Sequence, residues 1–387
     1  MADRLTYEVA EAVDPATMQP RWVVVGSDEL LHREASQWLD FLLAAGRSPN
    51  TVREYGRRVA WFLSWCSAVV DWRCVGLSQL VMWRRALSAD PTARSAASVN
   101  VCLVAVRSFY EWCDGHELLA TDVVEKMTRI KYFAPGTAGG GEHGARRRVL
   151  VDQLRTHRSG ASPPAWIDDV AARHRLERLE LPLRDRFLVD VLSCTGIRVG
   201  EALSLFTADL HFGGGDRRLG CVVGDPHFHV RVDNAVQNRA RAKGGPRVLF
   251  VHRDLVDGYI DYALERRRVL AQRGVVDHSP HVFVNLYGDD RWLGRAMSYT
   301  SVKRLMDRCS TRIGFDIRGP HMLRHTFATR LVRGIDCEAV PLDVVQALLG
   351  HVSLTSTRVY THDTEAAMKA ATVAMTARSG PSMGSGR

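Results

Sequence analysis

A glycine-rich segment at residues 134–145, Ala-Pro-Gly-Thr-Ala-Gly-Gly-Gly-Glu-His-Gly-Ala, divides the chain into two parts. Glycine loses the most conformational freedom on ordering, so such a run disfavours helix and strand and is typical of a tether between domains. Three arginines, Arg146, Arg147 and Arg148, follow at once. The pattern predicts a linker at residues 131–148 whose cations suit closure of two domains around a polyanion, although an ordinary exposed linker has the same composition.

The length of the chain indicates how many domains it can form, and its charge indicates what class of partner it binds. Its 387 residues, 46% hydrophobic, are enough for two domains with cores of their own. The formal net charge is +9 and comes mainly from arginine. An excess of this size favours a polyanionic partner, with nucleic acid as the first candidate. An arginine-rich genome raises charge in the same way, so composition alone leaves the two readings equal.

The eight cysteines show neither a C-x-x-C motif nor Cys/His pairs at zinc-finger spacing, which predicts buried, reduced thiols and no metal site. No apolar run approaches the roughly 20 residues of a membrane span. The first residues carry Asp3 and Arg4 and lack the apolar core of a signal peptide. We expect a cytoplasmic protein with no membrane contact and no cofactor.

The residues before the tether predict a helical bundle at 27–130, preceded by a weakly patterned extension at 1–26. Helices are expected from Ser27-Asp28 to Gly46, from Ser48-Pro49 onward, and near 78–88, 94–113 and 119–128. Seven of the nine tryptophans lie before residue 125 and recur at helical spacing, so we interpret them as core rather than as platforms for bases.

The residues after the tether predict a mixed domain at 149–376 and a disordered tail at 377–387. Helices are expected near 166–179, 183–194, 254–272, 299–312, 321–333, 342–349 and 357–374, and strands at 227–232 and 247–251. The predicted fold class is mainly α with a small antiparallel β-sheet.

Chemistry-bearing side chains concentrate near the C-terminus. His321 and Arg324 are three residues apart, so on a helix they share one face and reach one ligand. An arginine fork beside an imidazole suits a phosphate that is held while protons move. Gly350 and the hydroxyl-rich residues after His351 predict a break and a new helix. That turn would carry Tyr360 back toward the histidines, as a candidate covalent nucleophile for a phosphate.

Two further elements lie upstream. Arg198 is expected at a helix start, where backbone N–H groups already favour anions, and Glu201 one turn later would orient its guanidinium. Lys243 lies between the two expected strands, where a hairpin tip would let it protonate a leaving oxygen. A solvated turn lysine and a helix-capping arginine are the plainer readings of these residues taken singly.

These residues occur in the order found in the tyrosine recombinases, also called the phage integrase family, and the chain resembles that family across nearly its whole length. T-G-I-R-V-G-E-A-L resembles the first arginine box, H-M-L-R-H-T-F-A-T the second, and L-L-G-H-V-S-L-T-S-T-R-V-Y-T-H the tyrosine box. The N-terminal bundle resembles the core-binding domain. The catalytic positions carried over are Arg198, Lys243, His321, Arg324, His351 and Tyr360.

The resemblance implies a mechanism without metal or ATP. Tyr360 attacks a scissile DNA phosphate, forms a 3′-phosphotyrosyl bond and expels a 5′-hydroxyl. His321 accepts the tyrosine proton, Arg198 and Arg324 clamp the phosphate oxygens with His351, and Lys243 protonates the leaving oxygen. It also implies paired DNA sites and a synaptic tetramer, to which the helix after Tyr360 could contribute a contact with a neighbour or with its own domain.

The long connection before Lys243 departs from the family's usual tight hairpin, so a neighbouring basic residue could take its place. Arginine contacts to phosphate should make binding salt-dependent. The candidate DNA contacts are Arg53, Arg57, Arg94, Arg107, Arg146, Arg147, Arg148, Arg239 and Arg241. Within the family, the amino-acid sequences of the second arginine box and the tyrosine box favour a mobile-element recombinase. A DNA-binding regulator without cleavage and a type IB topoisomerase are the alternatives.

Overall fold

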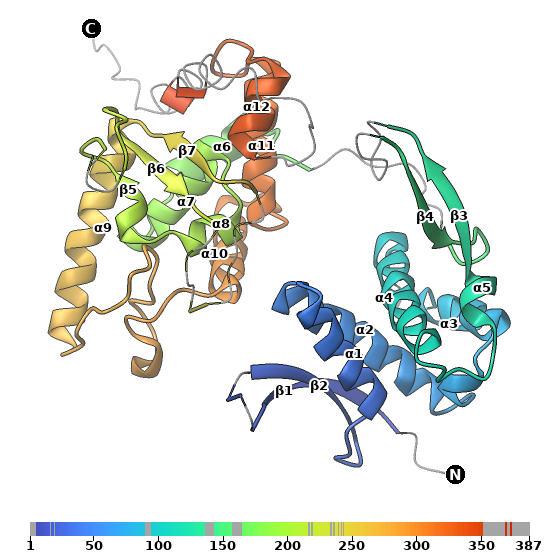
Figure 1. Ribbon diagram of the computed structural model, residues 1–387. Coiled ribbons are helices and arrows are strands. Elements are labelled where there is room, and N and C mark those ends of the chain that lie inside the picture. The colour runs from blue at the N-terminus through green and yellow to red at the C-terminus, as the bar shows by residue number, and fades with distance from the viewer. Residues whose placement is uncertain are drawn as a thin grey trace, which may run out of the picture. The chain divides into compact units, whose positions relative to one another are not determined.

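The computed structural model describes residues 5–15, 17–18, 20–89, 94–135, 143–156, 165–215, 217, 220–232, 234, 237–238, 240, 242, 244–350, 368–369 and 372–373. The chain forms two compact units, Met1–Ser162 and Pro163–Arg387, each with a buried hydrophobic cluster of its own (Figure 1). The described residues are mainly helical, with small antiparallel sheets. The predicted fold class is confirmed.

The first unit combines β-hairpins with a helical bundle. Its elements are β1 (Tyr7–Val13), β2 (Pro20–Gly26), α1 (Arg33–Ala44), α2 (Pro49–Cys66), α3 (Leu77–Leu87), α4 (Ala96–Asp114), α5 (Val123–Met127), β3 (Thr128–Phe133) and β4 (Ala145–Leu150). β1 and β2 pair antiparallel and pack on α1 and α2. The weak pattern of residues 1–26 predicts no such hairpin. It joins the bundle because Val24 is fully buried and because Gly56 of α2 lets Val9 approach closely.

Capping side chains set where the first helices begin. The Ser48 hydroxyl accepts the backbone N–H of Thr51 at 3.2 Å, and Pro49 stands in the first turn, so the predicted start of α2 is confirmed. The predicted start of α1 at Ser27-Asp28 is wrong, because the backbone N–H of Ser27 instead donates to Thr6 at the end of the hairpin. The imidazole of His32 caps α1.

Aromatic rings fill the core of the first unit, as the tryptophan spacing predicts. Trp38 on α1 is fully buried and meets Phe109 of α4 edge to face, with ring centroids 5.4 Å apart. Phe62 on α2 contacts Trp83 of α3 in the same way, at 4.9 Å. Such pairs add to the free energy that each ring contributes by leaving water.

A β-hairpin occupies much of the segment whose glycine content predicts a linker at residues 131–148. β3 and β4 pair antiparallel, from Thr128 opposite Leu150 to Phe133 opposite Ala145, and the two compact units divide at 162–163 instead. The strand-forming residues Ile130 and Tyr132 flank the glycine-rich run and stand opposite arginines of β4. Because a glycine-rich run suits a hairpin connection as well as a tether, composition alone misplaces the boundary.

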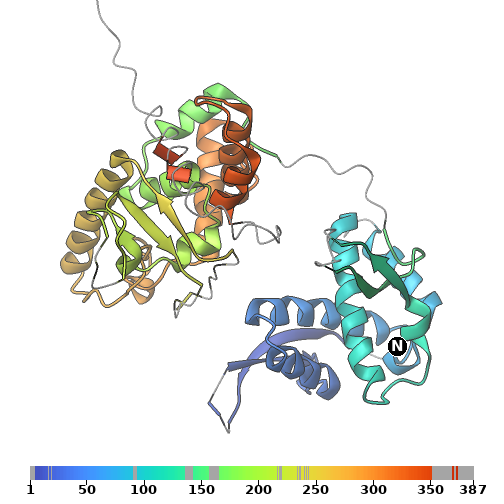
Figure 2. The ribbon, with the colours of Figure 1, turned by 45° about the horizontal axis from the view of Figure 1, so that its top comes forward.

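The second unit is built around a buried helix. Its elements are α6 (Val170–Glu177), α7 (Leu183–Thr195), α8 (Val199–Ser204), β5 (Leu210–His211), β6 (His227–Val230), β7 (Arg247–Phe250), α9 (Arg253–Gln272), α10 (Tyr299–Ile313), α11 (Pro320–Arg333) and α12 (Leu342–Leu349). α7 packs on α9 and α11, and it is buried on most of its circumference. The strands form one antiparallel sheet in the order β5-β6-β7. Figures 1 and 2 both show that sheet between α9 on one side and α11 and α12 on the other.

Most predicted elements of the second unit are confirmed. Both predicted strands, 227–232 and 247–251, appear with slightly shorter bounds as β6 and β7. The predicted helix at 357–374 and the tail at 377–387 lie largely or wholly outside the described residues. In the part of the chain that the structure describes, no helix is long and apolar enough to cross a bilayer. All eight cysteines are free thiols.

Candidate active site

The site begins where α7 ends and α8 starts. Gly196 closes α7 in the left-handed conformation, with φ of 60°, and a Cβ at this position would lie 2.3 Å from the ring of Phe327. Two residues later Arg198 is the residue that precedes the first turn of α8. The predicted helix start at Arg198 is therefore observed, and the sharp turn at Gly196 is what brings that arginine to the surface of the core.

Glu201 holds Arg198 in place. This glutamate is fully buried, and its Oε2 accepts the backbone N–H of Arg198 at 3.0 Å while its Oε1 accepts Nη1 of the same arginine at 3.0 Å. The Nη1 group also donates to the carbonyl oxygens of Leu349 and Gly350, each at 3.2 Å. Every hydrogen bond that this side chain makes to the described residues uses Nη1, so Nη2 and Nε are left for another acceptor.

Arg247 is a third member of the group, and the sequence reasoning missed it. Its Nη2 donates to Glu201 Oε2 at 2.7 Å, and its Nε donates to the carbonyl oxygen of Leu348 at 2.9 Å. The Nη1 group is buried and has no hydrogen-bond partner among the described residues. The signal that could have revealed it is a charged residue at the head of the otherwise apolar strand Arg247–Phe250.

Arg324 comes from the second arginine box. On α11 its side chain points into the core, only 4% exposed, while His321 on the preceding turn is exposed. Arg324 donates from Nη1 to the carbonyl oxygen of Gly196 at 2.7 Å and from Nη2 to that of Leu349 at 2.6 Å. α11 therefore carries the predicted His–Arg pair, with the arginine held from two sides.

The three guanidiniums of Arg198, Arg247 and Arg324 carry more positive charge than the single carboxylate of Glu201 balances. Burial lowers the pKa of Arg324 to about 9, and the positive charges of Arg198 and Arg247 add to this effect against the opposing charge of Glu201. Burial alone would raise the pKa of Glu201, but the hydrogen bonds and charges of Arg247 and Arg198 outweigh it and lower that pKa. The carboxylate therefore stays ionised and already has donors on both oxygens. Glu201 contacts Arg198 and Arg247, and Arg324 adds a third positive charge nearby, so this arginine group suits an incoming anion rather than a cation.

Lys243, His351, Tyr360, Arg239 and Arg241 lie outside the described residues. Two of their chain neighbours, Gly244 and Gly350, contact the arginine group, which consists of Arg198, Arg247 and Arg324 with Glu201. The backbone N–H of Gly244 donates to Glu201 Oε1 at 3.1 Å, and the carbonyl oxygen of Gly350 accepts Arg198 Nη1 at 3.2 Å. A Cβ on Gly244 would lie 2.7 Å from Glu201 Oε1, so a glycine is needed where this segment passes the carboxylate.

The predicted DNA contacts on α2 and before α4 make interactions inside the first unit. Arg53 and Arg57 have nitrogens 3.8 and 3.3 Å from the Glu54 carboxylate. The guanidinium of Arg94 stacks on Trp61, 4.0 Å from the ring centre. Since these pairs lie on the surface, they leave the cations accessible to a polyanion.

The predicted contacts on the β3–β4 hairpin present the stronger positive surface. Arg146, Arg147 and Arg148 are all exposed on β4, and Lys131 stands directly opposite Arg147 across the strand pair. Arg107 on α4 instead donates to the backbone carbonyl of Arg148 at 3.1 Å and so supports the hairpin. Like charges opposite one another destabilise a strand pair unless an anion neutralises them.

Comparison with known proteins identifies the family. Residues 171–367 match the phage integrase family and residues 35–114 match the phage integrase N-terminal SAM-like domain. Tyrosine recombinase XerC of Mycobacterium bovis (strain BCG / Pasteur 1173P2) is 30% identical over 332 residues, 85% of this chain and 93% of that protein. Transposase A from transposon Tn554 of Staphylococcus aureus (strain Mu50 / ATCC 700699) is 26% identical over 373 residues, 90% of this chain and 92% of that protein.

Among solved structures, the Tn1549 transposon integrase in complex with circular intermediate DNA is similar with a TM-score of 0.54. It is 13% identical and covers 86% of this chain and 97% of that one, a likeness of fold. The family matches cover both the helical bundle and the unit that carries the arginine group. The chain belongs to the phage integrase family: it is a tyrosine recombinase that acts on DNA, with a SAM-like core-binding domain before an integrase catalytic domain.

Proposed function

We propose that this recombinase cuts and rejoins DNA strands through a 3′-phosphotyrosyl intermediate, in the cytoplasm, during integration, excision or transposition of a mobile element. The observation that carries the chemistry is the arginine group of Arg198, Arg247 and Arg324 around the one buried carboxylate of Glu201. An excess of two positive charges at a partly buried site is stabilised by a bound anion, and a DNA phosphate supplies one.

Arg198 and Arg324 are suited to clamp the non-bridging oxygens of the scissile phosphate. Backbone carbonyls hold both guanidiniums before substrate arrives, and Glu201 also holds that of Arg198, so little reorganisation is needed when negative charge develops. Arg247 contacts Glu201 and the carbonyl of Leu348, which makes it a positioning residue in this proposal. We assign hydrogen bonding to the same phosphate to His351.

The covalent step transfers the phosphoryl group to tyrosine. The hydroxyl oxygen of Tyr360 bonds to phosphorus while the bond from phosphorus to the 5′-oxygen breaks. His321, exposed one helical turn from Arg324, accepts the tyrosine proton, and Lys243 gives a proton to the leaving 5′-oxygen. A 5′-hydroxyl from another strand reverses the step. The phosphotyrosyl ester keeps the energy of the phosphodiester, so rejoining needs no ATP.

The core-binding domain at 27–130 and the β3–β4 hairpin would hold the duplex. Exposed cations at Lys131 and at the three arginines of β4 make the hairpin a two-stranded basic ribbon, which suits contacts with phosphates along a groove. We propose that four copies assemble on two paired sites, with the catalytic domain of each copy acting on one strand.

Transposition or integration is favoured over a chromosomal role by two features. Residues 212–226 separate β5 from β6 and residues 231–246 separate β6 from β7, which are long intervals where a minimal recombinase needs only tight turns. The second is the similarity to a transposase over nine-tenths of the chain. The similarity to XerC keeps chromosome-dimer resolution as the competing role.

The deciding experiment is a denaturing gel of the full chain incubated with nicked duplexes. One duplex carries the ends of the protein's own genetic element and the other carries the chromosomal dimer-resolution site of the same cell. We expect a slow, protease-sensitive DNA–protein band with the element ends and none with Tyr360→Phe, which loses only a hydroxyl and keeps binding.

Each contrary outcome points to a different error. An adduct in Tyr360→Phe would show that the nucleophile is another residue. An adduct formed only with the chromosomal site would refute the mobile-element role and leave the chemistry intact. Binding of both duplexes without any adduct, on intact and nicked DNA alike, would favour a regulator that does not cleave.

A further inference from the structure

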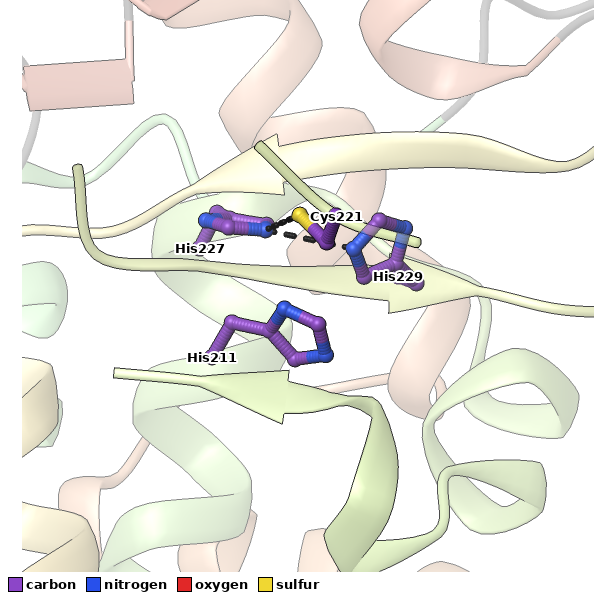
Figure 3. Close-up of side chains that lie close together, drawn as sticks. All are labelled: His211, Cys221, His227 and His229. Atoms are coloured by element: carbon purple, nitrogen blue, oxygen red, sulfur yellow. Dashed lines mark hydrogen bonds between the residues drawn. The ribbon is translucent and has the colours of Figure 1, made fainter. Parts of the chain in front are cut away.

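Four potential metal ligands, none of them a member of the arginine group, meet on one face of the small sheet. They are His211 of β5, His227 and His229 of β6, and Cys221 of the connection between these strands (Figure 3). One ligand atom from each lies within 4.8 Å of the other three. His211, Cys221 and His227 are buried, and His229 is half-buried.

Strand pairing assembles the three histidines. Side chains two residues apart on a strand share a face, so His227 and His229 point the same way while Phe228 and Val230 enter the hydrophobic core. His211 stands directly opposite His227 across the β5–β6 pair. This face of the sheet therefore presents imidazoles, where a sheet in a folded core ordinarily presents apolar side chains.

Close backbone contacts bring the cysteine to them. The backbone N–H of Gly215 donates to the carbonyl oxygen of Val223 at 2.6 Å, which folds the connection back on itself. A Cβ on Gly215 would lie 2.8 Å from Cys221 Sγ and 2.7 Å from Cys221 O, so only glycine fits beneath the thiol. Cys221 Sγ then lies 3.2 Å from Nε2 of His227.

His211 is left unsatisfied by the protein alone. It is 6% exposed, and neither of its ring nitrogens has a hydrogen-bond partner among the described residues. Burying an imidazole without hydrogen-bond partners is unfavourable, because its nitrogens lose their bonds to water and gain none in return. Its ring lies 5.0 Å from the ring of His227 and 4.7 Å from that of His229, centre to centre, so it faces the other donors. A ligand at the centre of the four would bind one of its two ring nitrogens.

His227 has the arrangement of a metal ligand. Its Nδ1 lies 2.6 Å from the carbonyl oxygen of Asp225, which can only accept, so Nδ1 carries the proton and Nε2 presents a lone pair. Histidines that bind metals usually donate their other ring N–H in this way. The Nε2 lone pair points at Cys221 Sγ and at Nε2 of His229, each 3.2 Å away.

We propose that His211, Cys221, His227 and His229 bind one structural zinc ion. Three imidazoles and one thiolate are a donor set that Zn²⁺ favours, and four protein ligands close its tetrahedron, which is the mark of a structural rather than a catalytic site. With bonds of about 2.0–2.3 Å, these tetrahedral donors would stand roughly 3.3–3.6 Å apart, and the four atoms already lie within 4.8 Å of one another. Binding releases the proton of the Cys221 thiol.

The spacing of these residues explains why the sequence predicts no metal. They read His-x9-Cys-x5-His-x-His, which is not a zinc-finger spacing, because strand register and a folded connection bring the donors together. The zinc would fix the connection at 212–226. Asp225 in that connection pairs with Lys369 in the segment that follows the tyrosine box, so the metal would steady the surface on which this segment rests.

The test is the metal content and the cobalt spectrum of the full chain, purified without an affinity tag or chelator. We expect inductively coupled plasma mass spectrometry to find about one zinc ion per chain, and we expect this zinc to be retained through gel filtration. Replacing zinc with Co²⁺ should produce visible ligand-field bands of tetrahedral cobalt and a near-ultraviolet thiolate-to-cobalt band. Protein that contains no zinc, and that leaves added Co²⁺ with the spectrum of the hydrated ion, would overturn the proposal.

Paired variants assign the ligands. Cys221→Ser should lose the thiolate-to-cobalt band, while Cys194→Ser, which removes another thiol from the same unit, should keep both zinc and band. His211→Ala should lose the zinc, and His278→Ala, which removes an exposed histidine, should retain it. A thiolate band that persists in Cys221→Ser would refute the site. If a ligand variant fails to fold, the spectrum of the wild-type protein still decides, and neither result depends on recombination activity.

Discussion

Arg198 and Arg324 donate hydrogen bonds to the same carbonyl oxygen, that of Leu349, at 3.2 and 2.6 Å. The two residues are 126 positions apart in the chain: Arg198 directly precedes α8, and Arg324 lies on α11. Two guanidiniums on one acceptor repel each other, and the one carboxylate within hydrogen-bonding reach, Glu201, binds Arg198 rather than Arg324. The C-terminal end of α12 thus gathers two cations whose charge is balanced only in part by the described residues.

Removing one of these cations tests the phosphate clamp. Arg324→Ala should reduce the rate of DNA cleavage by on the order of 10²-fold or more, because the developing charge is then deprived of one preorganised hydrogen-bond donor. Affinity for DNA should fall much less, since contacts spread along the duplex supply most of it. Cleavage on nicked DNA and binding by anisotropy, measured on the same preparation, separate the two effects. Cleavage at the wild-type rate would refute the clamp.

A double-mutant cycle tests whether Arg247 and Glu201 act as a pair. Arg247→Ala and Glu201→Ala should each lower the free energy of unfolding of the second unit by about 3–5 kcal/mol, because each leaves a buried charge without its partner. The double variant should lose about 1–3 kcal/mol less than the sum. Urea unfolding gives all four values. The exposed pair Arg318 and Asp316 is the matched control, and its coupling should be close to zero.

The lowered pKa of Glu201 predicts a pH dependence of stability. A carboxylate whose folded-state pKa lies below its unfolded value, here 4.5, contributes stability that is complete above that value and is lost as the pH falls through the folded-state pKa. Glu201→Gln cannot titrate, so it lacks this contribution. The difference in unfolding free energy between wild type and variant should therefore be largest near neutral pH and shrink below about pH 4.5. A difference that stays constant down to acid pH would contradict the assigned ionisation.

Local patterns in the sequence predict much of the fold because they depend on neighbouring residues. Ser48-Pro49 indicates the start of α2, and the apolar runs indicate β6 and β7, all of which the structure contains. Two features of the site are also predicted from neighbouring residues: Arg198 stands at a helix start, and His321 and Arg324 share one helix. Each requires only backbone geometry over a few residues.

Contacts between distant segments are what the sequence does not reveal. Arg247 has the pattern of an ordinary strand residue until folding brings it against Glu201, and the imidazoles of His211 and His227 meet only through strand register. The β3–β4 hairpin escapes prediction for another reason, because its glycine-rich connection has the composition of a tether. Pairing across a chain depends on which segments compete for the same partner, and no local pattern contains that information.

Gly196 should tolerate no side chain, and comparison with Gly314 separates the effect of a steric clash from that of backbone strain. Gly196→Ala should lower the free energy of unfolding by about 3 kcal/mol, since φ of 60° is strained for alanine and the new Cβ would lie 2.3 Å from the buried ring of Phe327. Gly314 has a similar φ of 65° but nothing within 4 Å, so Gly314→Ala should cost only the backbone strain, about 1 kcal/mol. Equal decreases in urea unfolding would mean that the clash with Phe327 is relieved at no cost.

The basic ribbon predicts how DNA binding depends on salt. Lys131 and Arg147 oppose each other on β3 and β4, and their repulsion is relieved only where phosphate approaches both. Lys131→Gln with Arg147→Gln should therefore weaken binding to any duplex. It should also make the slope of log K against log salt less negative by about 0.9 for each phosphate that the variant no longer neutralises, nearly 2 in all. Arg291→Gln is the control, since it removes one exposed charge from the second unit and should leave the slope unchanged. A salt slope equal to that of wild type in the double variant would show that the ribbon does not touch the DNA backbone. In that event the arginines of α2, which stay accessible beside Glu54, would have to bind the phosphates instead.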